Sequence, residues 1–289
     1  YVDTVWDAFA TLYEEGLVER GERVVNTCPR CETAVSDSRL EYDERTVDAV
    51  YVGFPLTDTE GDNNADTEGD GDTDTNADTD RHTEWAGTLV AWTTTPWTLV
   101  GNQFVAVDES AEYAAVTVDG ESTTAEPDDD PAALRSPLYV ASERVDAVLA
   151  ALGFEPGEWT VERTLPGTEL VGRTYDHPLA DRLPDHPTPR GSVAHADYVE
   201  TSGDGTGLVH SAPGFGHEDF ERGRDLDLPP FAPVALDGRF TEAAGPFAGQ
   251  RVHGEGRTAV LDALREAGTL LGTEQYVHEY PQCPRCDTD

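Results

Sequence analysis

Short apolar runs separated by turn residues make up most of the chain after a first helix-like segment. Residues 3–15 place their apolar side chains along one helical face, and Gly16 follows as a C-terminal stop. The later runs are four to eight residues long and rich in Val, Thr and aromatic residues, which is typical of strands. We therefore predict strands at 47–54, 88–95, 104–107, 113–118, 159–163, 193–199 and 207–211.

Helical spacing recurs at only three later places. We expect helices at 142–153, where Ser142 can cap the start, at 217–225, and around Val260 to Leu264 before Gly268. Because strands outnumber helices and show no regular βαβ alternation, the pattern predicts an α+β, β-rich fold, with a β-barrel decorated by helices. The sequence has no P-loop or Rossmann fingerprint, so it does not indicate a nucleotide-dependent activity.

One segment cannot contribute to a core. From Thr57 to Asp80 the chain consists almost wholly of Asp, Thr, Gly, Asn and Glu, without a large apolar residue. Such a composition buries too little apolar surface to offset the entropy of ordering. We predict a disordered acidic insertion at 57–82 and interpret its carboxylates as a solvated surface loop, not a metal site.

The charge of the chain is extreme. It carries 58 acidic and 19 basic residues, a formal net charge of −39, and every basic residue is arginine. This charge repels itself in dilute buffer, whereas in molar salt the Debye length falls to about 3 Å. An intrinsically disordered acidic protein and a folded salt-adapted protein both fit. The 37% hydrophobic content, with 5 Trp, 10 Tyr and 9 Phe, favours the folded, salt-adapted protein.

Composition also limits the partners and the compartment. No apolar stretch approaches the ~20 residues that span a bilayer, and no signal peptide is visible, so we expect a cytoplasmic protein without a membrane partner. The chain lacks methionine, including at position 1, which predicts a piece of a longer protein. An acidic surface argues against nucleic acid, because phosphate binding needs basic side chains. Concentrated salt weakens that objection.

All four cysteines lie in two identical words, Cys28-Pro29-Arg30-Cys31 and Cys283-Pro284-Arg285-Cys286. Two such knuckles can present four thiolates to one tetrahedral Zn²⁺. Closing the long intervening loop costs about 5 kcal/mol, against roughly 10–16 kcal/mol from a structural zinc. Two redox dithiols, two disulfides and half-sites completed by other chain segments are the alternatives. We predict one structural zinc, which has no open position for catalysis.

Two separated segments supply the candidate chemistry: Thr93-Thr94-Thr95-Pro96-Trp97-Thr98, and the run from Gly205 through Gly207 and His210 to Asp219. They offer hydroxyls, an imidazole, flexible backbone and a carboxylate, but no nucleophile paired with a base. Ordinary structural roles fit each residue singly, because an acid complements the first turn of a helix and threonine favours strands. A metal hydrolase using His210, His217 and Asp219 is a further alternative, although their spacing matches no known metal motif.

These words together resemble the editing domain of isoleucyl-tRNA synthetase. The Thr93–Thr98 run, the Gly205–Gly216 stretch, Glu218-Asp219 and both cysteine words occur in that family's order. Thr4-Val5-Trp6 and Asp237-Gly238-Arg239-Phe240-Thr241 match as well, so the resemblance spans nearly the whole chain. The HIGH and KMSKS signatures of the synthetic site are absent, so no isoleucine activation is expected of this chain.

The resemblance implies hydrolysis of valine wrongly esterified to the isoleucine tRNA, with the remainder of the synthetase chain and the 3′ end of the tRNA as partners. It implies that Asp219 holds the α-ammonium group of valine, while Thr95 and His210 line a pocket that excludes isoleucine. Thr93, Thr94 and Trp97 would position the ester and the terminal adenosine, with Gly205 and Gly207 in the binding loop. Water would attack the ester.

The domain organisation follows from the same comparison. Residues 1–56 would hold the N-terminal helix and the first half of a zinc module, 83–275 the editing domain, and 276–289 the second half of a zinc-ribbon-like module that joins the two ends. The alternatives are a zinc-organised structural or tRNA-binding module without activity of its own, and a zinc hydrolase. Deacylation by the chain separates the first from editing, and loss of activity on chelation identifies the second.

Overall fold

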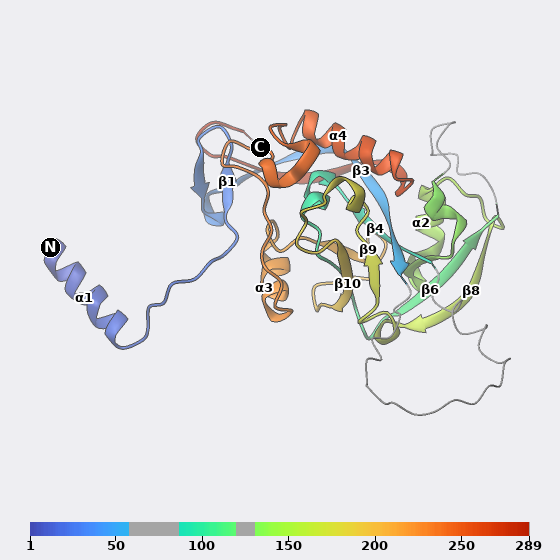
Figure 1. Ribbon diagram of the computed structural model, residues 1–289, viewed down its shortest axis with the longest axis horizontal. Helices are drawn as coiled ribbons and strands as arrows, with labels where there is room; N and C mark the ends of the chain where they lie inside the picture. The colour runs from blue at the N-terminus through green and yellow to red at the C-terminus, as the bar shows by residue number, and fades with distance from the viewer. Residues whose placement is uncertain (58–86, 120–130, 289) are drawn as a thin grey trace, which may run out of the picture.

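The computed structural model describes residues 1–57, 87–119 and 131–288 (Figure 1). The predicted acidic insertion at 57–82 lies outside these residues except for Thr57. The α-helices are α1 (Val2–Glu14), α2 (Val145–Ala151), α3 (His217–Asp225) and α4 (Glu255–Glu266). Short 3-10 helices are η1 (Asp37–Arg39), η2 (Pro96–Gly101), η3 (Ala132–Arg135), η4 (Ser142–Arg144), η5 (Gly167–Glu169), η6 (Ala180–Arg182) and η7 (Glu242–Phe247).

Strands account for most of the remaining regular structure. They are β1 (Asn26–Cys28), β2 (Thr33–Val35), β3 (Glu41–Thr57), β4 (Thr88–Thr93), β5 (Phe104–Val107), β6 (Glu112–Val118), β7 (Leu138–Ala141), β8 (Trp159–Pro166), β9 (Thr174–Asp176), β10 (Arg190–His195), β11 (Val209–Ser211) and β12 (Leu270–Gln282). All seven predicted strands correspond to strands here, with boundaries that differ by a few residues. The largest extension is β3, which begins at Glu41 instead of 47.

One large mixed sheet organises the chain, and β1 with β2 forms a separate hairpin. The order in the large sheet is β11-β5-β10-β9-β3-β4-β7-β6-β8, with β12 also paired to β3. The β3–β12 pairing is antiparallel and runs from Val52 opposite Leu270 to Glu41 opposite Gln282. Beyond it, β3 pairs with β4 on one edge and with β9 at its end. The sheet therefore radiates from one long strand.

The core lies on both faces of this sheet because the central runs are apolar at consecutive positions. Side chains alternate between the faces of a strand. Val50, Val52 and Phe54 therefore belong to one buried cluster, and Tyr51 belongs to the opposite one. Helix α4 covers the first cluster and α2 the second, through buried apolar side chains on each helix. The helices predicted at 217–225 and around Val260 to Leu264 are found as α3 and α4. The helix predicted at 142–153 is found as η4 followed by α2, but Ser142 does not cap it: the N-cap residue of α2 is Arg144, without a side-chain cap hydrogen bond.

The mixed α+β, sheet-rich architecture confirms the predicted class. Among the described strands, β11 and β8 end the pairing path without pairing to each other, so a closed barrel is not seen there. The sheet does curl, because the Ala141 amide at the end of β7 donates to the Thr206 carbonyl just before β11 (2.9 Å). Within the described residues no helix has the length and apolar character that crossing a membrane requires.

Helix α1 stands apart from this body on an extended connection (Figure 1). Its predicted apolar face exists but buries no residue: Val5 is 53% exposed and Phe9 47% exposed. A short isolated helix is only marginally stable in water. Such a helix normally gains its stability by packing its apolar face against other protein surface. The face contributes nothing to the core described above.

Deleting residues 1–16 should therefore leave the stability of the sheet body unchanged. We expect the free energy of unfolding in molar KCl to differ from that of the intact chain by no more than about 0.5 kcal/mol, the usual range for surface changes. Urea titration followed by tryptophan fluorescence measures it. A matched deletion of residues 26–35, the β1–β2 hairpin with Cys28 and Cys31, should destabilise the body clearly. A large effect of the first deletion would mean that α1 packs on the body.

Candidate functional site

The Thr93–Thr98 run lies where β4 leaves the sheet and turns into η2. Thr93 ends the strand, and its hydroxyl accepts a hydrogen bond from the Thr95 amide (3.1 Å) and lies 3.3 Å from the Thr95 hydroxyl. Pro96 occupies the first turn of η2, where its fixed φ fits and its missing N–H costs nothing. The turn therefore presents consecutive threonines at the end of a buried strand.

His210 in β11 faces this turn and is held at both ring nitrogens. Its Nε2 lies 2.9 Å from the Thr98 hydroxyl, and its Nδ1 lies 3.0 Å from the side-chain amide nitrogen of Asn102. An amide nitrogen can only donate, so Nδ1 is an acceptor and the proton resides on Nε2. Thr98 then accepts from His210 and donates to the Thr95 carbonyl (2.7 Å). The imidazole is a neutral, oriented part of the network.

The electrostatic environment agrees with a neutral imidazole. Burial lowers the pKa of His210 to about 4, because the imidazolium loses its hydration without gaining an acidic partner. The carbonyl of the Asn102 side chain accepts from the buried Tyr175 hydroxyl (2.6 Å). Asn102 is itself completely buried, and its amide also donates to the Phe104 carbonyl. A fully satisfied amide therefore fixes the histidine.

Asp219 lies in the first turn of α3 and turns back toward β11. Its Oδ2 accepts from the Ala212 amide (2.9 Å), and its Oδ1 accepts from the Tyr198 hydroxyl (3.1 Å). Burial raises the pKa of this carboxyl, while those two hydrogen bonds act in the opposite direction. A Cβ at Gly216 would lie 2.6 Å from Oδ2, so only glycine permits this approach. The carboxylate is oriented and partly desolvated.

The threonine turn and Asp219, the two halves of the candidate site, are connected through β11. His210 contacts the threonine turn, and the next residue, Ser211, places its hydroxyl 2.9 Å from Tyr198, which in turn donates to Asp219. Asn102 also donates to the Ser211 carbonyl (3.3 Å). A continuous set of hydrogen bonds therefore links Thr95 to Asp219. Thr93, Thr95, His210 and Asp219 are all part of this neighbourhood.

The other predicted residues lie around it. Thr94 follows β4, half-buried, between Thr93 and Thr95. Trp97 packs edge-on against Phe215 and His253, with ring centroids 5.1 and 5.4 Å away, and not against His210. Gly205 lies beside the Trp92 ring, and its carbonyl accepts from Arg144 (2.9 Å).

Gly207 has a specific backbone role. Its φ is +77°, and a Cβ there would lie 2.3 Å from that of Ala141. Both the positive φ and the close approach exclude a side chain. Its carbonyl accepts from the buried Tyr113 hydroxyl (3.0 Å), which fixes the loop that leads into His210.

Sequence reasoning missed Asn102, Tyr198 and Ser211, and it gave Thr98 no separate role. Asn102 and Tyr198 are distant in sequence from the residues they hold, and neither belongs to a recognisable motif. Ser211 did carry a signal, because it adjoins His210 in the same strand. A buried asparagine just after a 3-10 helix is the kind of residue whose partners only the fold reveals.

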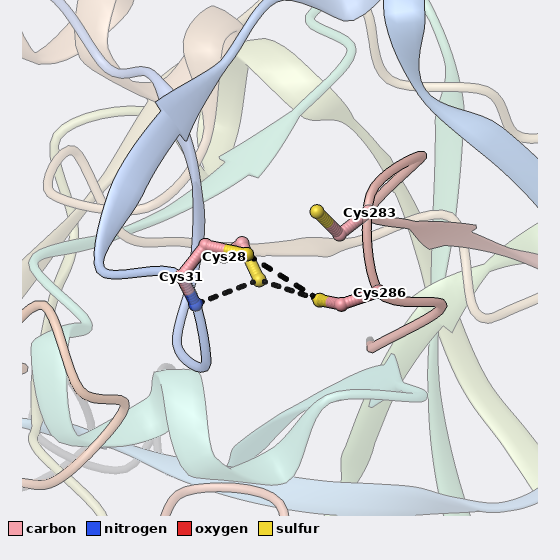
Figure 2. A group of neighbouring side chains, drawn as sticks. All are labelled: Cys28, Cys31, Cys283 and Cys286. Carbon is pink, nitrogen blue, oxygen red and sulfur yellow. Dashed lines mark hydrogen bonds between the residues drawn. The ribbon is translucent and has the colours of Figure 1, made fainter.

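The two cysteine words come together at the far end of the β3–β12 pair (Figure 2). The four sulfurs lie within 4.8 Å of one another, and the Sγ of Cys286 is 3.5 Å from those of Cys28 and Cys31. No disulfide joins them. Among the described residues this is the only cluster of three or more His, Cys, Asp or Glu that could hold a metal ion.

The donor set fits a tetrahedral ion. Four thiolates at about 2.3 Å from a zinc would be about 3.8 Å apart, close to the spacing found here. Neighbouring thiols raise the pKa of Cys31 to about 12, whereas the Thr288 hydroxyl and backbone lower that of Cys286 to about 6. The crowded thiols therefore resist joint ionisation unless a cation compensates the charge. This cluster can hold a metal ion.

Comparison with known proteins identifies relatives along the whole chain. The family of class I tRNA synthetases (I, L, M and V) matches residues 1–254. The isoleucine–tRNA ligase of Halobacterium salinarum is 41% identical over 100% of this chain, and that of Haloquadratum walsbyi is 42% identical over 100%. The chain spans only 23% and 24% of those two relatives, respectively.

Solved structures show the same fold at low identity. GlLeuRS-CP1 aligns with a TM-score of 0.52 and 14% identity, over 76% of this chain and 97% of that one. The editing domain of the cytosolic leucyl-tRNA synthetase from P. knowlesi aligns with a TM-score of 0.50 and 10% identity, over 81% of this chain and 97% of that one. The likeness covers the sheet body and not only one motif.

The neutral His210 predicts a pH dependence of stability. Its pKa of about 4 in the fold lies below the ~6.5 of an exposed histidine, so the unfolded chain binds the proton more readily. This contribution is fully present above pH 6.5 and is lost as the pH falls toward 4. Replacing His210→Gln should reduce the loss of unfolding free energy between pH 7 and pH 4.5, by on the order of 2 kcal/mol.

Urea titrations in molar KCl at the two pH values measure this difference. The exposed His217, mutated as His217→Gln, is the matched control and should behave like the parent chain. Equal pH dependence of the parent and the His210 variant would contradict a neutral His210 in the fold.

Proposed function

The chain belongs to the class I tRNA synthetases, and from that premise we propose that it hydrolyses valine wrongly esterified to the isoleucine tRNA. The observation that supports this most directly is the continuous hydrogen-bonded set from Thr95 to Asp219. It brings hydroxyls, a neutral imidazole and an oriented carboxylate together in a fold similar to known editing domains. Isoleucine–tRNA ligases are among the relatives in which such a segment occurs.

In this proposal Asp219 binds the α-ammonium group of the aminoacyl ester. Its oxygens accept from the Tyr198 hydroxyl and the Ala212 amide, and a carboxylate has further lone pairs for the substrate. Removing a partly buried carboxylate from water strengthens its attraction for an ammonium ion. The Tyr198 and Ala212 donors fix where that charge lies, so the ester carbonyl is placed by the same contact.

Water is the nucleophile, and the protein positions it instead of activating it strongly. His210 is a poor general base, because its Nδ1 faces an amide donor and its Nε2 carries the proton. The threonine hydroxyls and the 2′- or 3′-hydroxyl of the substrate's terminal ribose can orient water toward the carbonyl. Holding reactants in place accounts for much of a rate enhancement when the chemistry is otherwise easy.

The size of the amino-acid side chain decides which aminoacyl ester is hydrolysed. Isoleucine and valine differ by one methylene, which is worth only about 1–3 kcal/mol in a binding pocket; the isoleucyl enzyme is the standard illustration of this limit. A second site that rejects the larger side chain therefore multiplies the discrimination. We assign the rejecting surface to Thr95 and His210, whose positions are fixed by Thr98 and Asn102 and therefore cannot yield to an extra methylene.

We assign the four cysteines to one zinc ion with a structural role. Its shell would be complete, so it would supply no open position for water. The metal-hydrolase alternative loses support because both nitrogens of His210 are engaged and His217 is exposed. The remaining alternative is a module that binds tRNA without hydrolysing the ester. The remainder of the synthetase chain is the partner expected for the exposed face of α1.

Replacing Asp219→Asn should abolish selective hydrolysis. With Val-tRNA(Ile) and Ile-tRNA(Ile) in molar KCl, the parent chain should deacylate the valyl ester and leave the isoleucyl ester. The variant should be slower by at least about a hundredfold, because the ammonium group loses its charged partner. Release of labelled valine measures the rate.

Glu218→Gln is the matched control, because Glu218 is acidic, adjacent and exposed. It should retain the rate of the parent chain. If the chain is folded but does not hydrolyse the ester, the result supports the tRNA-binding module instead. Equal hydrolysis of both esters would contradict the proposed exclusion of isoleucine by size.

The metal assignment predicts about one zinc per chain and a stability that depends on it. The variant Cys286→Ser should bind zinc more weakly and unfold at lower urea concentration, because structural zinc sites contribute folding free energy. Plasma emission spectroscopy and urea titration measure the two effects. Chelation under conditions where the fold survives should leave the deacylation rate unchanged. Loss of activity there would support the metal-hydrolase alternative instead.

A further inference from the structure

Arginines are scarce in this chain, and most of those in the sheet body are engaged. The chain has 58 acidic residues against 19 basic ones. Most arginine side chains of the sheet body contact carboxylates, backbone carbonyls or aromatic hydroxyls. Examples are Arg182 with Glu266, Arg190 with Asp176, Arg224 with Glu221, Arg163 with Tyr139 and Arg222 with the His195 carbonyl.

Five arginines differ: four lie within residues 20–39, which include Cys28 and Cys31, and one lies between Cys283 and Cys286. We call them the knuckle arginines: Arg20, Arg23, Arg30, Arg39 and Arg285. All five are exposed, and none has an ion pair or a side-chain hydrogen bond within the described part of the chain. Two of them occupy the same position in the two Cys-Pro-Arg-Cys words. Exposed arginines without a partner are therefore concentrated in the two segments that carry the cysteines.

The local charge balance reinforces this difference. Residues 17–40 contain four acidic residues and four arginines, so this stretch is formally neutral in a chain of net charge −39. An anionic ligand approaching the molecule meets less repulsion here than over the rest of the surface. In concentrated salt, where long-range fields are screened, direct contacts with such arginines decide where an anion binds.

A cavity of about 800 Å³ lies between this region and the sheet body. Its lining includes Arg23 beside Glu22, and four of its five rings are Trp97, Phe215, His253 and Tyr280. These four rings form a contiguous set, with centroids 5.1 Å apart for Trp97–Phe215, 5.4 Å for Trp97–His253 and 5.8 Å for His253–Tyr280. Trp97 belongs to η2, whose Thr98 contacts His210, so the cavity adjoins the candidate site.

We propose that the knuckle arginines and this ring-lined cavity form a binding surface for single-stranded RNA. Guanidinium groups pair with phosphates, and aromatic side chains accept stacked bases, which together are the two elements of single-strand recognition. The rings favour RNA as the ligand, because bases can stack on them. An acidic protein segment would use only the arginines. The proposal rests on the proposed function for the identity of the RNA: the 3′ segment of the tRNA, guided past the zinc module toward η2.

The test uses the 289-residue chain and a fluorescein-labelled single-stranded RNA of roughly 12 nucleotides, within the range such surfaces cover. Fluorescence anisotropy gives the affinity as a function of KCl concentration, over the range in which circular dichroism shows a folded protein. The triple variant Arg23→Gln, Arg30→Gln, Arg285→Gln should flatten the slope of log K against log[KCl] by about 2. Its affinity near 0.5 M KCl should fall about fourfold.

The matched control is Arg182→Gln, Arg190→Gln, Arg224→Gln, which removes the same charge from the sheet body. It should leave both the slope and the affinity unchanged, because exposed ion pairs contribute little to the fold. Tyr280→Leu should weaken binding about fivefold or more without changing the slope, since stacking involves no counterion release. Equal losses in both triple variants, or none in the first, would overturn the proposal.

Failure of this proposal is distinguishable from failure of the editing function. Binding of the short RNA requires no ester and no hydrolysis, so the anisotropy result stands whether or not the chain deacylates tRNA. Asp219→Asn should bind the RNA like the parent chain. The knuckle triple variant should still hydrolyse Val-tRNA(Ile) at saturating concentration, with an increased KM and an unchanged kcat. A lowered kcat at an unchanged KM would place these arginines in a role other than RNA binding.

Discussion

The pairing of β3 with β12 is the constraint on which the rest of the molecule depends. These strands are more than 200 residues apart in sequence, yet they pair from Val52 and Leu270 to Glu41 and Gln282. Forming that pairing closes nearly the whole chain into one loop, whose entropic cost rises only logarithmically with length. Once it is formed, the strand edges of β3 fix β4 and β9, and the cysteine words meet at its far end.

The sheet buries an amide side chain whose donor and acceptor groups need partners, and the candidate site is built around it. Asn102, buried where η2 meets β5, would be costly without partners for both its donor and acceptor groups. Its hydrogen bonds to Tyr175, His210 and the Ser211 carbonyl meet that requirement and simultaneously orient the imidazole. The same residues therefore complete the core and orient the side chains of the candidate site. A polar network of this kind rigidifies only if every member is present.

Local sequence patterns predicted the parts of the molecule that depend on local physics. Strands such as Phe104–Val107 follow from apolar runs, helix α4 follows from the helical spacing of its apolar residues before Gly268, and the duplicated cysteine words indicated their own pairing. The role of Tyr198 was not predictable, because its hydroxyl reaches Asp219 only after β10, β11 and α3 are assembled. The exposed face of α1 shows the converse: periodicity predicts a buried stripe but does not say which surface covers it.

The ribbon formed by the outer halves of β3 and β12 also determines how the cysteine cluster is joined to the sheet body. Its side chains are mostly exposed, and no third strand flanks it beyond Val50 and Thr93 among the described residues. Twist between neighbouring strands is larger in two-stranded ribbons than in wide sheets. Because β12 spans roughly 40 Å, the twist of this ribbon decides which side of the cysteine cluster faces the sheet body.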